Sequence, residues 1–129
     1  VNHRYSLDDR FVIKRNHLAL IGQNTRYPIA EAVKLAREYR SDIEIEVEVQ
    51  NLDMVKEALE ADVDFIILDH MTIPVICKAV DVIDGKAYVE ATGDITLDTI
   101  RAYAATGVNG ISVGALTYSV PSIDMRLRF

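Results

Sequence analysis

The chain has 129 residues, half of them apolar, so it can bury one moderate hydrophobic core and not two. Its formal net charge of −6 and the lack of a basic stripe argue against a nucleic-acid binder, whose affinity rests on clustered lysine and arginine. No apolar run is long enough to span a bilayer, the first ten residues are too polar for a signal peptide, and a single cysteine, Cys77, excludes a disulfide framework. We therefore expect a cytoplasmic protein with neither nucleic acid nor membrane as a partner.

Short β-branched runs alternate along the chain with longer segments of helical periodicity, a pattern typical of helices and strands around a parallel sheet. The strands that we predict are residues 11–14, 43–48, 64–68, 87–91 and 109–113. The helices that we predict are residues 29–39, a segment capped by Asn51, residues 74–82, and a segment capped by Thr96 that ends at Gly107. Residues 122–129 alternate in polarity and form either a last strand or a terminal arm.

This order of elements predicts an α/β fold of about five strand–helix units. Periodicity alone fits both an open doubly wound sheet and an arc of a barrel. A full eight-unit barrel typically needs about 250 residues, so this chain by itself would form only part of one. We expect residues 1–129 to fold as a single partial barrel, with its open edges covered by another chain or by more of the same enzyme.

Charged side chains fall at the predicted carboxyl ends of four strands. They are Lys14, Glu48, Asp69 and Glu90, and Gly114 marks the same point on the fifth strand. In parallel βα folds this rim carries the chemistry. Carboxylates with a lysine suit a phosphorylated substrate bound with Mg²⁺, because carboxylates hold hard cations and lysine supplies a point charge to phosphate.

Two loops and the first residues offer further candidate binding groups. Residues 91–94 and 113–117 each follow a strand and place a glycine, Gly93 or Gly114, where backbone N–H groups can approach an anion. A lone glycine after a strand is more often a simple turn, but in barrels the paired loops after the last strands are a recurrent phosphate site. In the cluster of His3 and Arg4, the arginine guanidinium could bind a carboxylate through two hydrogen bonds, or the cluster could simply be an exposed terminus.

Residues 2–128 contain a series of short motifs in a fixed order: Asn2-His3-Arg4-Tyr5 with Leu7-Asp8, Ile13-Lys14 with Asn16-His17, Ile45-Glu46-Val47-Glu48-Val49, Leu68-Asp69, Gly107-Val108, and Ile111-Ser112-Val113-Gly114-Ala115-Leu116-Thr117. Taken in this order, the motifs resemble the C-terminal barrel portion of the quinolinate phosphoribosyltransferase family. The resemblance implies a TIM-like barrel, a homo-oligomer, and an enzyme whose N-terminal domain and first barrel strands are absent from this chain. It further implies that phosphoribosyl pyrophosphate and quinolinate are joined to give nicotinate mononucleotide, CO₂ and pyrophosphate in NAD biosynthesis.

The resemblance also assigns roles to single residues. It implies that His3, Arg4 and Lys14 bind the two carboxylates of quinolinate, and that Glu48 and Asp69 face the ribose and its Mg²⁺. Lys14, Glu48 and Asp69 are then the catalytic set. Thr92, Gly93 and Gly114 are implied to seat the 5-phosphate.

Four residues depart from the usual family pattern: Arg15, His70, Asp94 and Tyr118. Asp94 stands where the family normally has a second glycine, so it adds a side chain and a negative charge beside the expected phosphate. Two other functions therefore stay open. One is a non-catalytic or redesigned partial-barrel scaffold that self-associates, and the other is a phosphate-ester binding module in which the quinolinate residues have no role.

Overall fold

Five parallel strands form one sheet in a computed structural model that describes residues 3–119, 122–123 and 125–128. The strands are β1 (Arg10–Ile13), β2 (Glu44–Val49), β3 (Phe65–Asp69), β4 (Tyr88–Thr92) and β5 (Gly110–Ile111). Their order in the sheet is their order in the chain, and each strand is parallel to the next. A doubly wound sheet would reverse its order at one point, so this sheet is an arc of a barrel.

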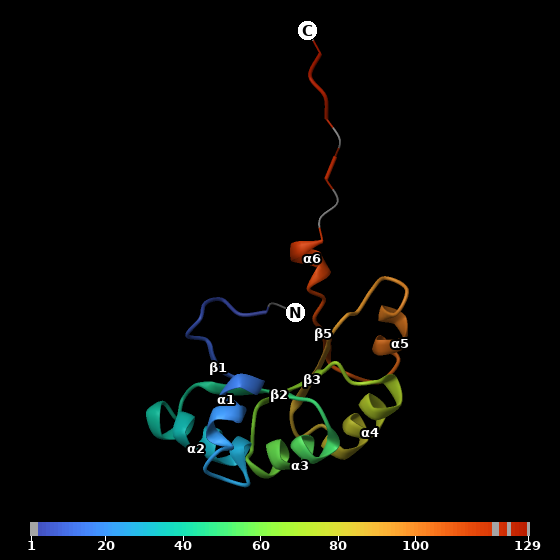
Figure 1. Ribbon diagram of the computed structural model, residues 1–129. Coiled ribbons are helices and arrows are strands. Elements are labelled where there is room, and N and C mark those ends of the chain that lie inside the picture. The colour runs from blue at the N-terminus through green and yellow to red at the C-terminus, as the bar shows by residue number, and fades with distance from the viewer. Residues whose placement is uncertain (1–2, 120–121, 124, 129) are drawn as a thin grey trace.

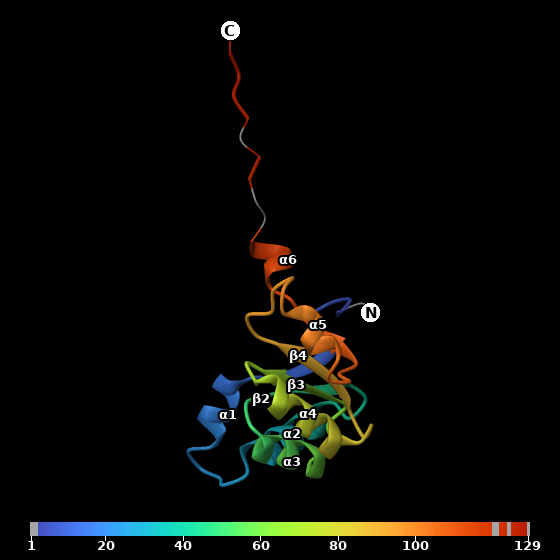
Figure 2. The ribbon, with the colours of Figure 1, turned by 90° about the vertical axis from the view of Figure 1, so that its right-hand side faces the viewer.

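Within the described residues, six helices connect or follow these strands. They are α1 (Arg15–Ile21), α2 (Pro28–Tyr39), α3 (Leu52–Glu60), α4 (Ile73–Ile83), α5 (Ile100–Ala104) and α6 (Ala115–Tyr118). Figure 1 shows α2, α3 and α4 along one face of the curved sheet, and Figure 2 shows the same layering from the side. Among the described residues, no helix has the length and apolarity needed to cross a membrane.

The hydrophobic core lies between the sheet and these helices. Side chains of a strand alternate between its two faces, and the helix-facing set of β2 is Ile45, Val47 and Val49, all fully buried. They pack in one cluster with Ile29 of α2 and Val55 of α3. The alternate side chains therefore face the concave side of the arc, where the fold leaves room for polar groups.

The concave side carries charge even deep in the sheet. Arg10 donates hydrogen bonds to Glu44 at 3.1 Å and to Glu46 at 3.3 Å. Its guanidinium also lies 3.6 Å from the ring centroid of Phe65. Glu46 is buried but has Arg10 as its partner, so no uncompensated charge remains there.

The predicted strands and the long helices are confirmed, with boundaries shifted by a few residues. The structure has β1 to β4 within one residue of the predicted ranges, and α2, α3 and α4 where helices were predicted. Asn51 caps α3 as expected, because its side chain accepts a hydrogen bond from the Met54 N–H at 2.9 Å. β5 is shorter than predicted and covers only Gly110–Ile111, although the N–H groups of Asn109 and Ser112 still donate to the carbonyls of Val89 and Ala91, each at 2.9 Å.

Helices α1 and α6 and the start of α5 differ from the sequence prediction. Helices α1 and α6 were not predicted, because α1 buries only Leu18 and α6 is a single turn, so neither shows apolar periodicity. The predicted cap Thr96 is wrong: its N–H donates to the Thr99 side chain at 2.9 Å, and the helix begins only at Ile100. Of residues 122–129, those described form no strand and leave the side chains of Ile123 and Met125 exposed, while residues 124 and 129 lie outside the described part.

Candidate active site

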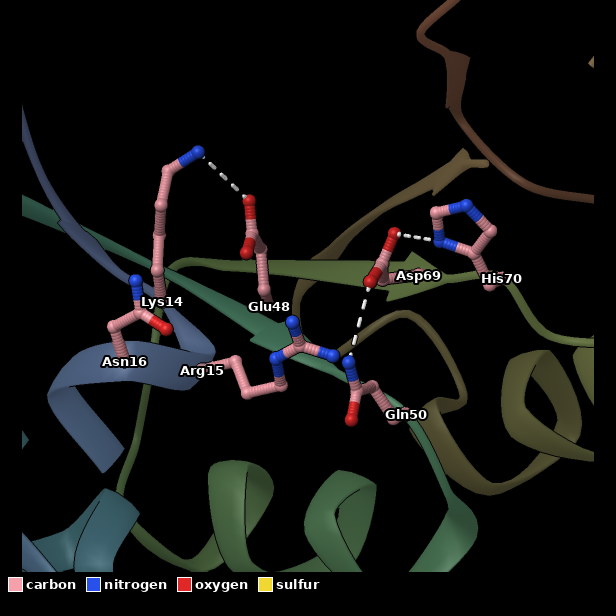
Figure 3. Close-up of a pocket in the computed structure, with 7 residues that line it drawn as sticks. All are labelled: Lys14, Arg15, Asn16, Glu48, Gln50, Asp69 and His70. Atoms are coloured by element: carbon pink, nitrogen blue, oxygen red, sulfur yellow. Dashed lines mark hydrogen bonds and ion pairs between the residues drawn. The ribbon is translucent and has the colours of Figure 1, made fainter. Parts of the chain in front are cut away.

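A pocket of about 570 Å³ opens at the carboxyl ends of β1, β2 and β3. Its lining residues, which together we call the lysine pocket, are Lys14, Arg15, Asn16, Glu48, Gln50, Asp69 and His70. Figure 3 shows their side chains gathered at the ends of neighbouring strands. The three residues predicted to be catalytic, Lys14, Glu48 and Asp69, therefore share one pocket.

Lys14 and Glu48 form an ion pair at the mouth of this pocket. Strand register pairs Ile13 with Val47, so the residues that follow, Lys14 and Glu48, come side by side on the concave face. The Lys14 Nζ lies 3.1 Å from the Glu48 Oε1 (Figure 3). More than half of the lysine side chain is exposed, so the ammonium can reach a bound anion while it keeps its carboxylate partner.

The position of Lys14 is fixed by the start of α1. The backbone N–H of Lys14 donates to the Nδ1 of His17 at 3.0 Å. This contact satisfies one of the N–H groups that the first turn of a helix leaves without a partner. Sequence reasoning left His17 outside the catalytic set, and the structure places its ring in contact with the Lys14 backbone.

Asp69 is held from two sides. The Gln50 Nε2 donates to one of its oxygens at 3.4 Å, and the His70 Nδ1 lies 2.6 Å from the other. A carboxylate has about four acceptor positions on its two oxygens, so two contacts leave room for a ligand. Gln50 and His70 were not predicted to touch Asp69, because only their place just after a strand points to this rim.

The predicted phosphate residues line a second, smaller hollow. This cavity, which we call the loop hollow, has a volume of about 180 Å³. It is lined by Thr92, Gly93 and Gly114 together with Asp94, Ser112 and neighbouring residues. The Thr92 side chain donates to the Ser112 carbonyl at 3.4 Å, which joins the loops that follow β4 and β5. His70 lines both this hollow and the lysine pocket, so the two cavities are neighbours along the rim.

His3 and Arg4 lie outside the lysine pocket. Arg4 contacts the Nε2 of His3 through two guanidinium nitrogens, at 3.2 Å and 2.9 Å. His3 lines a third cavity of about 730 Å³ on the concave face, where Thr92 and Gly114 also lie. The structure thus brings His3 near the predicted phosphate residues and does not bring it or Arg4 to Lys14.

Glu90 was predicted to end its strand, and this is wrong. Strand β4 runs on to Thr92, so Thr92 is the residue that register places opposite Asp69. Glu90 sits one step further inside the sheet, where its carboxylate accepts the hydroxyl of Ser112. It lines the third cavity and not the lysine pocket.

A barrel arc with a lysine and two carboxylates at its carboxyl rim defines the class of the protein as a βα-barrel domain with a charged pocket at that rim. Residues 1–128 match the family model described as quinolinate phosphoribosyl transferase, C-terminal domain. The chain belongs to this family.

Sequence and structural similarity to individual proteins supports this assignment. The chain is 42% identical to the probable nicotinate-nucleotide pyrophosphorylase (carboxylating) of Methanocaldococcus jannaschii, over 97% of this chain and 45% of that protein. It is 36% identical to the chloroplastic nicotinate-nucleotide pyrophosphorylase (carboxylating) of Arabidopsis thaliana, over 98% of this chain and 40% of that protein. The NadC crystal structure from Streptococcus pyogenes superposes with a TM-score of 0.83 at 35% identity, over 95% of this chain and 42% of that chain.

These comparisons confirm the predicted family and the partial-barrel fold. The chain spans less than half the length of these relatives, 45% and 40%. Nothing in the comparisons favours the scaffold alternative.

Proposed function

We propose that this chain carries the phosphoribosyl-binding rim of an enzyme that transfers phosphoribosyl from phosphoribosyl pyrophosphate to quinolinate. The reaction would release pyrophosphate and CO₂ and give nicotinate mononucleotide, as in NAD biosynthesis. One observation carries the proposal: Lys14, Glu48 and Asp69 share a pocket beside the hollow that holds Thr92, Gly93 and Gly114. This arrangement suits a substrate with a reacting ribose at one end and a phosphate at the other.

The carboxylates have a role in the chemistry at the ribose. When pyrophosphate leaves, positive charge develops on the ribose ring, and fixed negative groups nearby stabilise that charge. Glu48 and Asp69 supply such groups from two adjacent strands. Lys14 can hold a carboxylate of quinolinate, because an ammonium has three N–H donors and Glu48 occupies one of them.

The donor set also fits Mg²⁺ bound together with a substrate. Among residues 3–119 and the other described positions, no group of three acidic, histidine or cysteine side chains could hold a metal by itself. Mg²⁺ usually takes one or two carboxylates plus substrate phosphates and water, which Glu48, Asp69 and the pyrophosphate group could provide. Bound there, the metal would neutralise charge on the pyrophosphate as it leaves.

His3 and Arg4 remain candidates for quinolinate recognition. Their mutual contact uses the Nε and Nη2 of Arg4 and leaves Nη1 available, and His3 lines the cavity on the concave face. The quinolinate site also needs the rest of the enzyme, either further segments or a second subunit of a homo-oligomer. A cytoplasmic location is part of the same proposal.

A phosphate-ester binding module is the second candidate. The observation that favours it is the separation of His3 and Arg4 from Lys14, because the loop hollow can form without a complete quinolinate site. Such a module would bind ribose 5-phosphate and show no affinity for quinolinate.

Calorimetric titration with phosphoribosyl pyrophosphate, with and without Mg²⁺, tests the proposal. We expect Mg²⁺-dependent binding that an Asp69→Ala substitution abolishes. An Asp53→Ala substitution is the matched control, because Asp53 is an exposed aspartate of α3 that does not line the lysine pocket. Absence of binding by a folded chain, or equal loss in both variants, would contradict the proposal.

A further inference from the structure

Arg15 brings a second cation into the lysine pocket. It is the first residue of α1, and its side chain lines the pocket together with Glu48 and Asp69. Figure 3 shows its guanidinium extending from α1 toward Gln50, just after the end of β2. The steps proposed above leave this guanidinium without a role, although arginine binds anions through strong, charge-assisted hydrogen bonds.

The guanidinium of Arg15 forms no ion pair or side-chain hydrogen bond within the part of the chain that the structure describes. The two carboxylates of the pocket have other partners. Glu48 pairs with Lys14 at 3.1 Å, and Asp69 accepts a hydrogen bond from Gln50 at 3.4 Å. The five N–H donors of Arg15 are therefore open to a ligand.

Arg15 also sets the charge of the pocket. With it, two cationic side chains balance the carboxylates of Glu48 and Asp69, whereas Lys14 alone would leave the pocket negative. A negative pocket repels a polyanion, and the repulsion grows where water is partly excluded. Arg15 thus makes a rim with two carboxylates compatible with a highly charged ligand.

The order of the strands indicates which anionic group Arg15 faces. The loop hollow lies at the ends of β4 and β5, the two carboxylates follow β2 and β3, and Arg15 follows β1 at the opposite end of the arc. A substrate with its phosphate in the loop hollow and its reacting carbon beside the carboxylates has its other end toward β1. In Figure 3 the Lys14 ammonium and the Arg15 guanidinium lie on opposite sides of Glu48, an arrangement that suits two separate anionic groups.

We propose that Arg15 binds the pyrophosphate group of phosphoribosyl pyrophosphate and stabilises it as it leaves. The bond between the anomeric carbon and the pyrophosphate oxygen breaks, its electron pair stays on that oxygen, and Arg15 offsets the negative charge that develops there. The guanidinium donates hydrogen bonds and transfers no proton. This inference rests on the proposed function and adds a residue for its leaving group.

Titration of the chain with inorganic pyrophosphate in the presence of Mg²⁺ tests this role. We expect Arg15→Gln to weaken pyrophosphate binding roughly tenfold, because charge-assisted hydrogen bonds are lost. Ribose 5-phosphate, which lacks the leaving group, should bind within about threefold of its affinity for the unsubstituted chain. Arg15→Lys keeps the charge but not the planar donor fork, so it should recover only part of the loss.

Arg26→Gln is the matched control. Arg26 is an exposed arginine that does not line the lysine pocket, so this variant should bind pyrophosphate like the unsubstituted chain. Arg15 is exposed as well, and all three variants should therefore keep the urea unfolding midpoint of the unsubstituted chain.

Three results would overturn the role of Arg15: unchanged pyrophosphate affinity in Arg15→Gln, an equal loss for pyrophosphate and ribose 5-phosphate, or no pyrophosphate binding by the unsubstituted chain. The proposed function would survive each of them if phosphoribosyl pyrophosphate still binds in a manner that depends on Mg²⁺ and Asp69. Pyrophosphate binding that depends on Arg15, in a chain that does not bind phosphoribosyl pyrophosphate, would instead overturn the proposed function and leave a pyrophosphate site at Arg15.

Discussion

The carboxylate of Glu57 on α3 accepts a hydrogen bond of 2.7 Å from the backbone N–H of Ile29, in the first turn of α2. The same oxygen accepts the next N–H, that of Ala30, at 3.1 Å. α2 has no side-chain cap of its own, since its N-cap residue is Tyr27. A side chain distant in sequence therefore caps the helix and also brings negative charge to the positive end of its dipole.

Replacing Glu57 should destabilise the fold without touching the rim. We expect Glu57→Ala to lower the free energy of unfolding by about 1–2 kcal/mol, because two helix N–H groups lose their acceptor. Glu60→Ala, on an exposed residue of the same helix, should change it by less than about 0.5 kcal/mol. Urea denaturation of both variants measures the difference, and equal values would contradict the capping role.

The Lys14–Glu48 pair should matter for binding and little for stability. Its lysine side chain is 55% exposed, and exposed ion pairs contribute about 0–1 kcal/mol. Lys14→Met should therefore lower quinolinate affinity at least roughly tenfold, since a charged hydrogen-bond donor is lost, and leave the unfolding free energy nearly unchanged.

Lys34→Met is the matched control for this change. Lys34 is an exposed lysine that also faces a carboxylate, Glu31 at 3.9 Å, but it lies on α2. Isothermal titration should show normal quinolinate affinity for this variant in the complete enzyme. If Lys14→Met binds equally well, Lys14 has no part in recognition.

His17 should stabilise the start of α1 through its contact with the Lys14 backbone. The Nδ1 atom accepts a hydrogen bond, so the ring proton of the neutral side chain is on Nε2, and ¹⁵N NMR can observe this tautomer. His17→Ala should cost about 0.5–1.5 kcal/mol in unfolding free energy. His17→Asn, which keeps an acceptor at a similar distance, should recover most of that loss, and failure to do so would argue against the contact.

The sequence predicts which residues lie at the carboxyl ends of the strands better than it predicts the contacts between their side chains. Lys14, Glu48 and Asp69 fall in one pocket because parallel strands bring their carboxyl ends to one edge, and a strand end can be recognised from a β-branched run. The approach of the His70 Nε2 to the Asp94 Oδ2, at 3.6 Å, could not be predicted, since it depends on two positive φ angles in residues that carry side chains.

Short elements were the other source of error. Helix α1 buries one residue, Leu18, so it has no apolar stripe to reveal it. The start of α5 depends on a turn in which Thr96 donates its N–H to the Thr99 side chain, and apolar periodicity does not reveal such a turn. Glu90 was misplaced because the strand continues through Thr92 and no turn residue marks its end before Gly93.

Gly93 offers a sharp test of the loop hollow, with another glycine of the chain as its control. Gly93 has a φ of 105°, and an added Cβ would lie 2.7 Å from the His70 ring and 2.8 Å from its backbone nitrogen. Gly85 also has a positive φ, 72°, but a Cβ there would meet nothing within 4 Å. The two positions share a left-handed backbone and differ in the space around them.

Alanine at both positions separates strain from crowding. Gly85→Ala should cost about 1 kcal/mol for the positive φ alone. Gly93→Ala should cost roughly 2 kcal/mol more, because the chain must move away from His70 to admit the methyl group. Ribose 5-phosphate affinity should fall with Gly93→Ala and stay unchanged with Gly85→Ala. Equal stability losses in urea denaturation would show that the loop after β4 does not pack on His70 as described. Phosphate binding preserved in Gly93→Ala would show that this loop does not form the phosphate seat.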